Sequence, residues 1–395
     1  AIGHPVRLSV EQAALVNGAS GHVWEIDDTH RQTMMHPGDS VIGAALAVGE
    51  WLGADGPRVL AAIVAGYEVA VRVCAAVSPS HLERGWHPSG TANTFGAAAA
   101  AGKLLGLDPK GMAWAFGLAA TQAAGTFCHL PERAMSKDLN PGKAGANGVL
   151  AALLAAEGFT GSVTALENDK GFARTHADAA ELDRITAGLG RSYRIDEVAF
   201  KPYSCCRHCH SAIDAALRLR TSYDIAAGDI RRVDVFLYPM AAALVNDPEP
   251  FEKGLYGARY SVHFNVALAM LAGEAGMERA LLDQEYVRAM LDDPQVREIM
   301  RRVHVSVDAE LARGWPDRWP ARVAVHLRNG VVRQETVEYP LGEPENPMTY
   351  EQLVKKFNRA SQGYLSTTDA ARVLDTVENL DRLDNVVMLT GMLSK

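Results

Sequence analysis

The chain has 395 residues, of which 48% are hydrophobic and 22% are charged, and its formal net charge is −8. These values are close to globular averages and exclude disorder as the main character of the chain. The acidic balance argues against a nucleic-acid-binding scaffold, and the length favours two or three domains. The five cysteines are an odd number in a long chain, which argues against a secreted disulfide framework. The first residues show no signal-peptide pattern, so we expect a cytoplasmic protein.

The first half of the sequence has a helical pattern. Apolar residues recur at three- and four-residue spacing in 59–73, 95–108 and 147–161. Gly106 suits a left-handed helix end, and Asp108 with Pro109 suits the start of the next helix. The uncharged stretches 85–102 and 111–131 are interrupted by Gly, Pro and polar residues, which favours buried helices over membrane spans.

The pattern changes near residue 193. Strands are predicted over 231–239 and 301–308, and a hairpin over 321–340, with Asn329-Gly330 as a type I′ turn. Helical spacing accompanies these strands in 211–223 and 260–273 and returns in the tail after residue 349. We therefore predict a mainly α protein. It has a discontinuous helical domain (1–192 and 346–395) and a smaller, inserted α+β lid domain (193–345).

Polar clusters stand between the apolar helices. Five are apparent, at 21–39, 84–91, 136–148, 200–214 and 258–265. Each also has a structural interpretation. Residues 27–29 resemble a helix N-cap, His36 a turn residue, and a lone histidine such as His87 is more often a hydrogen-bonded core residue. The segment 140–148 suits a Gly-rich anion-binding loop at a helix start, but it matches neither nucleotide-binding motif.

Three cysteines and two histidines crowd the segment 205–210. Cys206 and Cys209 have C-x-x-C spacing, which is typical of zinc or redox pairs. The chain has no second C-x-x-C pair, so a zinc finger is not predicted. A zinc site built on Cys206, Cys209 and His210 with ligands from elsewhere stays a minor alternative, and our main prediction contains no metal.

Taken together, the clusters suit proton chemistry on a carboxylate. Removing a proton beside a carboxylate needs a base and positive charge that stabilises the resulting aci-carboxylate. The chain offers the cations Lys137, Lys201 and Arg207 and the imidazoles His36, His87 and His210. This combination predicts chemistry that requires no cofactor.

Several phrases, in this order, resemble the MmgE/PrpD family, whose members include dehydratases, decarboxylases and an epimerase of small carboxylic acids. They are NGASGHVWEIDDTH, HPG, GYE, GWHPSGTANTFGAAAAAGKLLGLD, NPGKAGANGVLAALLAAEGFTG, KPYSCC with HSAIDA, and YSVHFNVALAM. The resemblance spans nearly the whole chain. It implies a helical domain with an α+β lid, a homodimer, and an active site in the cleft between the domains. Members usually carry a further helical segment ahead of the point where this chain begins.

The resemblance also assigns residues to the site. Glu25, in place of the more usual Asp, and Thr29 are expected to line it, and Asp27 with Glu25 to orient or tune its other groups. The expected acid and base are His36 and His87. The resemblance also gives Lys137 and Lys201 as lysines of the site. From the clusters themselves, we expect Arg207 to share carboxylate binding or aci-carboxylate stabilisation with them, and His210 to be a further contact.

Two positions depart from the decarboxylases of the family. Those enzymes carry a His where this chain has Cys206, and a Tyr where it has Phe264. Cys206 is therefore expected to line the site without taking the role that the histidine has in those decarboxylases. The neighbouring His263 is expected to offer a different polar contact.

Three functions follow as hypotheses. The first is a cofactor-independent lyase, of hydro-lyase or decarboxylase type, that abstracts an α-proton from a small di- or tricarboxylate. The second is an epimerase or racemase of an amino- or iminodicarboxylate, which needs the same groups around one carbon. The third is a catalytically silent binding homologue. The expected partners are the carboxylate and a second copy of the chain, without nucleic acid or membrane.

Overall fold

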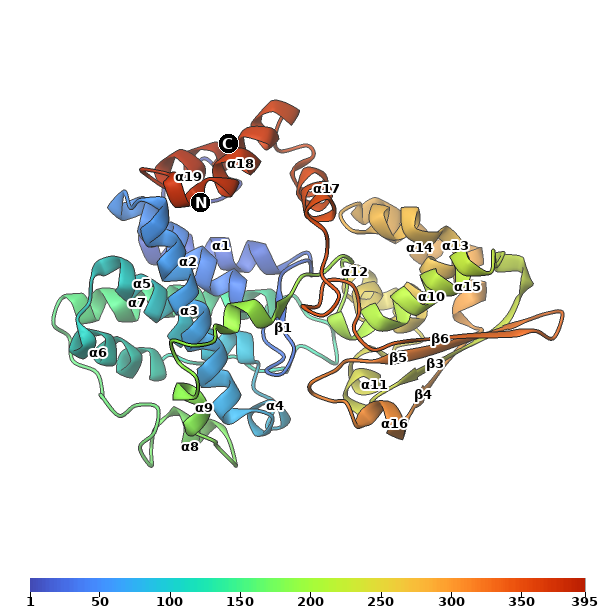
Figure 1. The fold of residues 1–395 in the computed structure, drawn as a ribbon, viewed down its shortest axis with the longest axis horizontal. Helices are drawn as coiled ribbons and strands as arrows, with labels where there is room; N and C mark the ends of the chain where they lie inside the picture. Colours follow the sequence, from blue (N-terminus) through green and yellow to red (C-terminus); the bar gives the residue numbers. More distant parts are fainter. Residues whose placement is uncertain (395) are drawn as a thin grey trace.

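The computed structural model describes residues 1–394, which form two bodies and a tail (Figure 1). The first, called the helical body, contains α1 (Val10–His22), α2 (Pro37–Leu52), α3 (Gly56–Val77), α4 (Ser80–Glu83), α5 (Pro88–Leu105), α6 (Pro109–Ala120), α7 (Ser136–Ala156), α8 (Phe172–His176) and α9 (Asp183–Thr186). The tail contains α17 (Tyr350–Ser361), α18 (Thr367–Glu378) and α19 (Val387–Leu393). Helix α19 packs on α2, so the tail returns to the helical body and brings the chain ends together.

The second body, called the α+β body, is built on a four-stranded sheet. Its strands are β3 (Ile230–Leu237), β4 (Val303–Val307), β5 (Ala321–Leu327) and β6 (Val332–Val337), in the order β4-β3-β5-β6. Its helices are α10 (His210–Ser222), α11 (Pro239–Val245), α12 (Gly254–Arg259), α13 (Val262–Ala280), α14 (Gln284–Asp292), α15 (Pro294–Met300) and α16 (Ala309–Ala312). Helices α10 and α13 cover one face of the sheet (Figure 1). The mainly α class with a smaller α+β part is confirmed.

Helix boundaries in the helical body follow local sequence signals. Asp108 caps α6 by accepting a hydrogen bond from the Gly111 amide at 2.7 Å, and Pro109 stands at the first helical position. Gly106 ends α5 in the left-handed conformation, with φ 73°. These predicted boundaries are confirmed.

Helix α7 differs from its prediction. It begins at Ser136, so the segment 140–148 is helical and is not an anion-binding loop. Pro141 lies in the second turn of α7, and small residues follow it. A Cβ atom on Gly142 would lie 2.5 Å from the Leu15 carbonyl oxygen of α1. Glycine here marks close helix packing instead of a turn, which a single sequence does not distinguish.

The predicted hairpin is correct, but its turn type is wrong. Strands β5 and β6 pair antiparallel, and the Leu327 amide donates to the Val331 carbonyl at 2.8 Å. Positive φ occurs at Gly330 (88°) but not at Asn329, whereas a type I′ turn requires it at both central residues. The loop therefore holds three residues, with glycine in the left-handed position.

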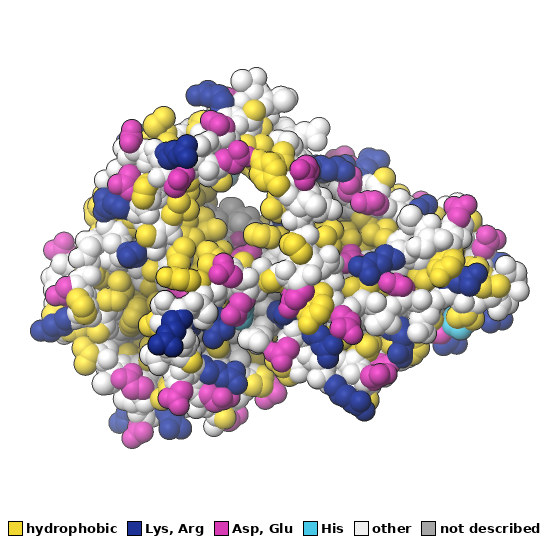
Figure 2. All heavy atoms as spheres, in the orientation of Figure 1, with side chains coloured by type: hydrophobic (Ala, Val, Ile, Leu, Met, Phe, Trp, Pro, Cys, Tyr) yellow, Lys and Arg dark blue, Asp and Glu magenta, His cyan; other side chains and the backbone are white. Residues whose placement is uncertain are grey.

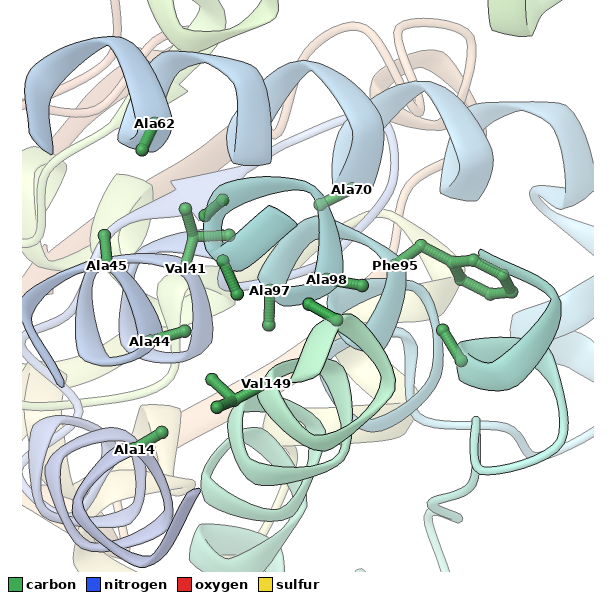
Figure 3. Close-up of a cluster of buried hydrophobic side chains, with 14 of the residues drawn as sticks. Ala14, Val41, Ala44, Ala45, Ala62, Ala70, Phe95, Ala97, Ala98 and Val149 are labelled. Atoms are coloured by element: carbon green, nitrogen blue, oxygen red, sulfur yellow. The ribbon is translucent and has the colours of Figure 1, made fainter. Parts of the chain in front are cut away.

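Small side chains let the helices of the helical body pack closely (Figure 3). Gly66 of α3 faces Gly96 of α5. A Cβ atom on Gly66 would lie 2.9 Å from the Gly96 carbonyl oxygen, and one on Gly96 would lie 2.7 Å from the Gly66 carbonyl oxygen. Alanines such as Ala97 and Ala98 fill the remaining space. The alanine-rich composition is thus the basis of close backbone contact.

Two hydrophobic cores divide the described residues. One joins α1–α3 and α5–α8 to Val373, Leu380, Val386 and Leu389 of the tail, and the other lies between the sheet and helices of the α+β body. The domain division at 1–192, 193–345 and 346–395 stays a prediction. By length and composition alone, α3 is apolar enough to cross a membrane, but 61% of its most apolar window is buried inside the protein. Core helices commonly pass this test.

Candidate active site

A connecting segment between α1 and α2 places the first cluster between the two bodies (Figure 1). It contains β1 (Thr29–His30), which pairs with β2 (Val198–Ala199), Thr29 lying opposite Ala199. This pairing joins two segments that are about 170 residues apart in sequence. It brings Lys201, two residues after β2, to the acids that precede β1.

Both candidate acid/base histidines stand at helix starts. His36 directly precedes α2, and His87 directly precedes α5. In each case a proline follows at the first helical position, where its fixed φ favours helix initiation. The two His-Pro dipeptides thus fix where each imidazole leaves the backbone.

Glu25 is the centre of a buried ion-pair cluster. The Lys201 ammonium donates to Glu25 Oε2 at 2.8 Å and to Asp27 Oδ1 at 2.9 Å. Lys137, in the first turn of α7, donates to Glu25 Oε1, and the Tyr260 hydroxyl donates to the same oxygen at 2.8 Å. Glu25, Lys137 and Tyr260 are buried, and Lys201 is completely buried. Asp27 is half-buried as a residue, with its side chain only 2% exposed. Glu25 itself has φ 53°, an uncommon value for a residue with a side chain.

His22, which no sequence pattern predicts as a site residue, joins the two parts of the cluster. Its Nδ1 lies 2.7 Å from Asp27 Oδ2 and 2.8 Å from Asp39 Oδ2, while its Nε2 accepts from Lys137. The last residue of α1 therefore links a lysine to two carboxyl groups. The available signal was its spacing, three residues before Glu25 and five before Asp27. Tyr260 was also missed, within the cluster 258–265.

His36 is held by the acids beside it. Its Nδ1 lies 2.9 Å from Asp27 Oδ2 and 2.8 Å from the Asp28 carbonyl oxygen, with the Thr29 hydroxyl at 3.3 Å. With two oxygens facing it, Nδ1 carries the hydrogen. In the neutral ring, Nε2 then has a free lone pair.

His87 has the opposite hydrogen-bonding arrangement. Its Nδ1 lies 2.9 Å from Asn140 Nδ2 of α7, so the amide donates and Nε2 carries the hydrogen. The His22 ring is near both imidazoles, with its centroid 5.0 Å from that of His36 and 6.2 Å from that of His87. One site thus holds one imidazole with an accepting Nε2 and one with a donating Nε2.

The electrostatics favour ionisation of two carboxyl groups and oppose that of a third. Burial by itself raises the pKa of Glu25, but Lys137 and Lys201 outweigh it and hold that pKa well below its usual range. Burial likewise opposes the ionisation of Asp27, but His36 and Lys201 keep its pKa well below normal. Burial and the neighbouring Asp27 raise the pKa of Asp39 well above normal. Glu25 and Asp27 are therefore anions at neutral pH, whereas ionisation of Asp39 is disfavoured by its burial and by the Asp27 charge.

The imidazoles away from solvent are neutral. Burial and the nearby Lys137 ammonium lower the pKa of His22 to about 4. The same two causes place the pKa of His87 well below its usual value. A neutral imidazole has one nitrogen that donates a hydrogen bond and one that accepts a hydrogen bond or a proton.

Two family models match the chain in succession. Residues 1–185 match the MmgE/PrpD N-terminal domain, and residues 203–382 match the MmgE/PrpD C-terminal domain. The chain belongs to the MmgE/PrpD family. The resemblance seen in the sequence is confirmed.

Curated MmgE/PrpD relatives cover the full chain at low identity. The cis-aconitate decarboxylase of Aspergillus terreus (strain NIH 2624 / FGSC A1156) is 29% identical over 100% of this chain and 83% of its own length. The human cis-aconitate decarboxylase is 27% identical over 99% of this chain and 81% of its own. The 2-methylcitrate dehydratase of Escherichia coli (strain K12) is 23% identical over 97% and 82%. These relatives are lyases, and they support an enzyme of the lyase class.

Three residues expected in the MmgE/PrpD site lie outside the ion-pair cluster. Arg207 forms two hydrogen bonds with Glu343 Oε1, at 2.8 and 3.1 Å, and donates to His210 Nδ1 at 2.9 Å. His210 also directs Nε2 to the Cys205 carbonyl at 3.3 Å, so both of its nitrogens are occupied. His263 bonds to Asn246 and borders a separate cavity with His304. Sequence proximity to the motif did not reveal these competing partners.

The cysteines of the MmgE/PrpD cluster 200–214 are buried thiols. Burial and the nearby Glu25 raise the pKa of Cys206 to about 12, so it stays neutral at physiological pH. We expect iodoacetamide at neutral pH to modify Cys128, which is exposed, and to leave the other four cysteines unmodified until the protein is unfolded. Intact-protein mass spectrometry counts the added groups, and rapid labelling of a second native thiol would contradict this prediction.

Within residues 1–394, one group of side chains comes close enough to share a metal ion: His22, Asp27 and His36. Its atoms already bond to one another, and Lys137 and Lys201 contact the same groups. Two ammonium groups oppose the entry of a divalent cation. The alternative based on Cys206, Cys209 and His210 gains no support, because these side chains form no such group in the described part of the chain.

Proposed function

We propose that this MmgE/PrpD protein is a cofactor-independent lyase that removes an α-proton from a small di- or tricarboxylate. The observation that carries the proposal is the pair of oppositely hydrogen-bonded imidazoles beside two buried lysines. The relatives named for cis-aconitate and 2-methylcitrate support the carboxylate class. The chain's own groups supply the base, the proton donor and the positive charge.

His36 is the proposed base. Asp27 and the Asp28 carbonyl oxygen fix its Nδ1–H, which leaves Nε2 free to accept the α-proton. The Asp27 carboxylate then stabilises the imidazolium that forms, as an orienting acid does in a catalytic triad. Thr29 adds a weaker contact to the same ring nitrogen.

His87 is the proposed hydrogen-bond donor. Asn140 occupies its Nδ1, so Nε2–H is the group that remains for the substrate. Its depressed pKa keeps the ring neutral, and a neutral imidazole donates a hydrogen bond to a developing oxyanion or leaving hydroxyl. The proton that the leaving hydroxyl needs is the α-proton, which the His36 imidazolium holds after it is removed from the substrate. The position of the hydrogen on each ring thus assigns its role: Nε2 of His36 accepts, and Nε2 of His87 donates.

Lys137 and Lys201 are the proposed aci-carboxylate stabilisers. Proton loss places a second negative charge on the substrate carboxylate, and buried ammonium groups stabilise it more strongly than water does. Glu25 and Tyr260 hold these ammonium groups in place before substrate enters. Cys206 in place of the decarboxylase histidine favours water over carbon dioxide as the group lost.

The test is a panel of small di- and tricarboxylates followed by NMR in deuterated water. His36→Gln and His87→Gln are expected to lower kcat by about 10²–10⁴-fold, the usual contribution of general acid–base catalysis. His4→Gln, an exposed histidine, is the control. Dialysis against a chelator is expected to leave turnover unchanged.

Near-wild-type turnover in both histidine variants would overturn this assignment. The products separate the alternatives. Loss of water indicates a hydro-lyase, and loss of carbon dioxide indicates a decarboxylase. Deuterium at Cα without either loss indicates an epimerase or racemase. The homodimer and the cytoplasmic location implied by the family stay predictions.

A further inference from the structure

The ion-pair cluster by itself offers a substrate no surplus of positive charge. Lys137 and Lys201 are matched by Glu25 and Asp27, and His22 is neutral. A di- or tricarboxylate carries at least one carboxylate beyond the one whose α-proton is removed. Binding it requires donors that are not already committed to protein acids.

Such donors and acceptors occur together on one segment, residues 129–138, which leads into α7. Three of the nine buried side-chain polar atoms that lack a partner among residues 1–394 come from it: His129 Nε2, Arg133 Nε and Asp138 Oδ1. Buried polar atoms in folded proteins nearly always have partners. Three unpartnered atoms in ten residues indicate a place prepared for a bound molecule or for water.

This segment borders the proposed catalytic groups. The His129 ring centroid lies 5.7 Å from that of His87 in an edge-on arrangement. The Arg133 guanidinium lies over the Tyr260 ring, 4.5 Å from its centroid, and Tyr260 in turn contacts Glu25. Asp138 directly follows Lys137. The three unpartnered atoms therefore belong to the surroundings of one site.

Arg133 is the cation that the cluster lacks. Its Nη2 donates to the Leu244 carbonyl oxygen of α11 at 2.8 Å, and no described carboxylate forms an ion pair with it. Its backbone has φ 55°, a strained value for a side-chain-bearing residue, and such strain is concentrated at functional sites. Arg259 and Lys356 also donate to backbone carbonyls near the cluster, but neither leaves a buried nitrogen without a partner.

His129 offers an acceptor. Its Nε2 is buried and has no partner, and the Thr126 backbone is among the groups near the ring. With the hydrogen on Nδ1, Nε2 presents a lone pair. Burial and the nearby Lys137 also keep the ring neutral by lowering its pKa to about 4. A neutral acceptor of this kind suits a hydroxyl group and repels a carboxylate.

We propose that Arg133 and His129 are substrate-binding residues that select a hydroxylated di- or tricarboxylate. Arg133 binds a carboxylate remote from the reacting carbon, and His129 Nε2 accepts the substrate hydroxyl. This inference rests on the proposed function and adds the residues that determine specificity. A guanidinium donor beside an uncharged acceptor matches a hydroxyl and a carboxylate on one small molecule.

The test measures binding, so it does not depend on turnover. Isothermal titration calorimetry compares two ligand pairs that differ by a hydroxyl group, citrate with tricarballylate and malate with succinate. In at least one pair the wild-type protein is expected to bind the hydroxylated member about 3–10-fold more tightly, the contribution of one hydrogen bond. His129→Leu is expected to bring that ratio close to one, while the affinity for the other member changes less than about threefold.

Arg133→Gln is expected to weaken both members of the pair by about tenfold or more and to preserve their ratio, since a charge-assisted hydrogen bond to a carboxylate is lost. His129→Gln, which keeps an acceptor, is expected to restore part of the ratio. The controls are Arg174→Gln and His4→Leu, which change exposed side chains. Thermal unfolding of each variant verifies folding. If His129→Leu does not fold, the glutamine variants at the two positions decide.

The outcomes separate this inference from the proposed function. A wild-type ratio near one, or unchanged binding in both the His129 and Arg133 variants, overturns the inference and means that these atoms bind water only. The His36 and His87 measurements then still test the lyase. Tight, discriminating binding without turnover of any acid overturns the lyase and supports the inference. A wild-type protein that binds neither ligand pair overturns both.

Discussion

Replacement of Lys201 by methionine is expected to lower the free energy of unfolding by about 3–5 kcal/mol and to abolish turnover, because it leaves two buried carboxylates without their shared cation. The Lys201 ammonium is completely buried and bonds to Glu25 and Asp27 at 2.8 and 2.9 Å. Burial alone would lower its pKa, yet the two acids raise that pKa above normal. The measurement is urea unfolding at neutral pH, together with kcat on the identified substrate.

A surface lysine provides the matched control. Lys355 pairs with Glu278 while its side chain is 63% exposed, so Lys355→Met is expected to change stability by less than about 1 kcal/mol. Lys201→Arg keeps the charge and is expected to recover part of the stability, with less recovery of turnover, because the planar guanidinium differs in shape. If Lys201→Met were as stable as Lys355→Met, the ion pairs of Lys201 with Glu25 and Asp27 would not stabilise the folded protein.

The protein is expected to lose stability steeply between pH 6.5 and 4, and His81→Gln is expected to reduce that loss by about 3 kcal/mol. Burial lowers the pKa of His81 from 6.5 to about 4, and its side chain bonds to Thr91 at 2.7 Å and to the His176 carbonyl oxygen at 3.0 Å. Between pH 6.5 and 4, His81 is protonated in the unfolded state but stays neutral in the folded state. The free energy of unfolding contributed by His81 is therefore complete above pH 6.5 and falls as the pH drops towards 4.

Urea unfolding across this pH range measures the slope. The comparison is between slopes, because His81→Gln also removes hydrogen bonds and lowers stability at neutral pH. His4→Gln, at an exposed histidine, is expected to leave the slope unchanged. An identical pH dependence in wild-type protein and His81→Gln would contradict the prediction. The neutral buried rings of His22 and His129 are expected to add to the wild-type slope in the same direction.

Local signals in the sequence predicted most of the secondary structure. The strands around 231–239 and 301–308 and the hairpin around 321–340 are present as β3, β4, β5 and β6. Such elements depend on alternation, caps and turn residues that act over a few positions. The start of α7 was missed because its glycines are used for contact with α1, which local patterns do not report.

The sequence predicted which residues belong to the site better than it predicted which of them contact one another. Phrases carried by the family resemblance identified Glu25, Lys137 and Lys201, which the structure joins in one cluster. His22 was not selected, since its importance depends on α1 ending beside Asp27 and Lys137. Arg207 was predicted to bind a substrate carboxylate, but Glu343, far away in sequence, pairs with it.

The low aromatic content, the alanine runs and the modest acidic charge determined a mainly helical, closely packed chain with an enzyme-like surface. Acidic and basic side chains are interspersed on the face shown in Figure 2, and the two lysines proposed to stabilise the aci-carboxylate are buried. The family motifs determined which side chains are available for chemistry. Only the tertiary structure decided their protonation states and partners. Burial and long-range pairing set those properties, and both depend on residues that are distant in sequence.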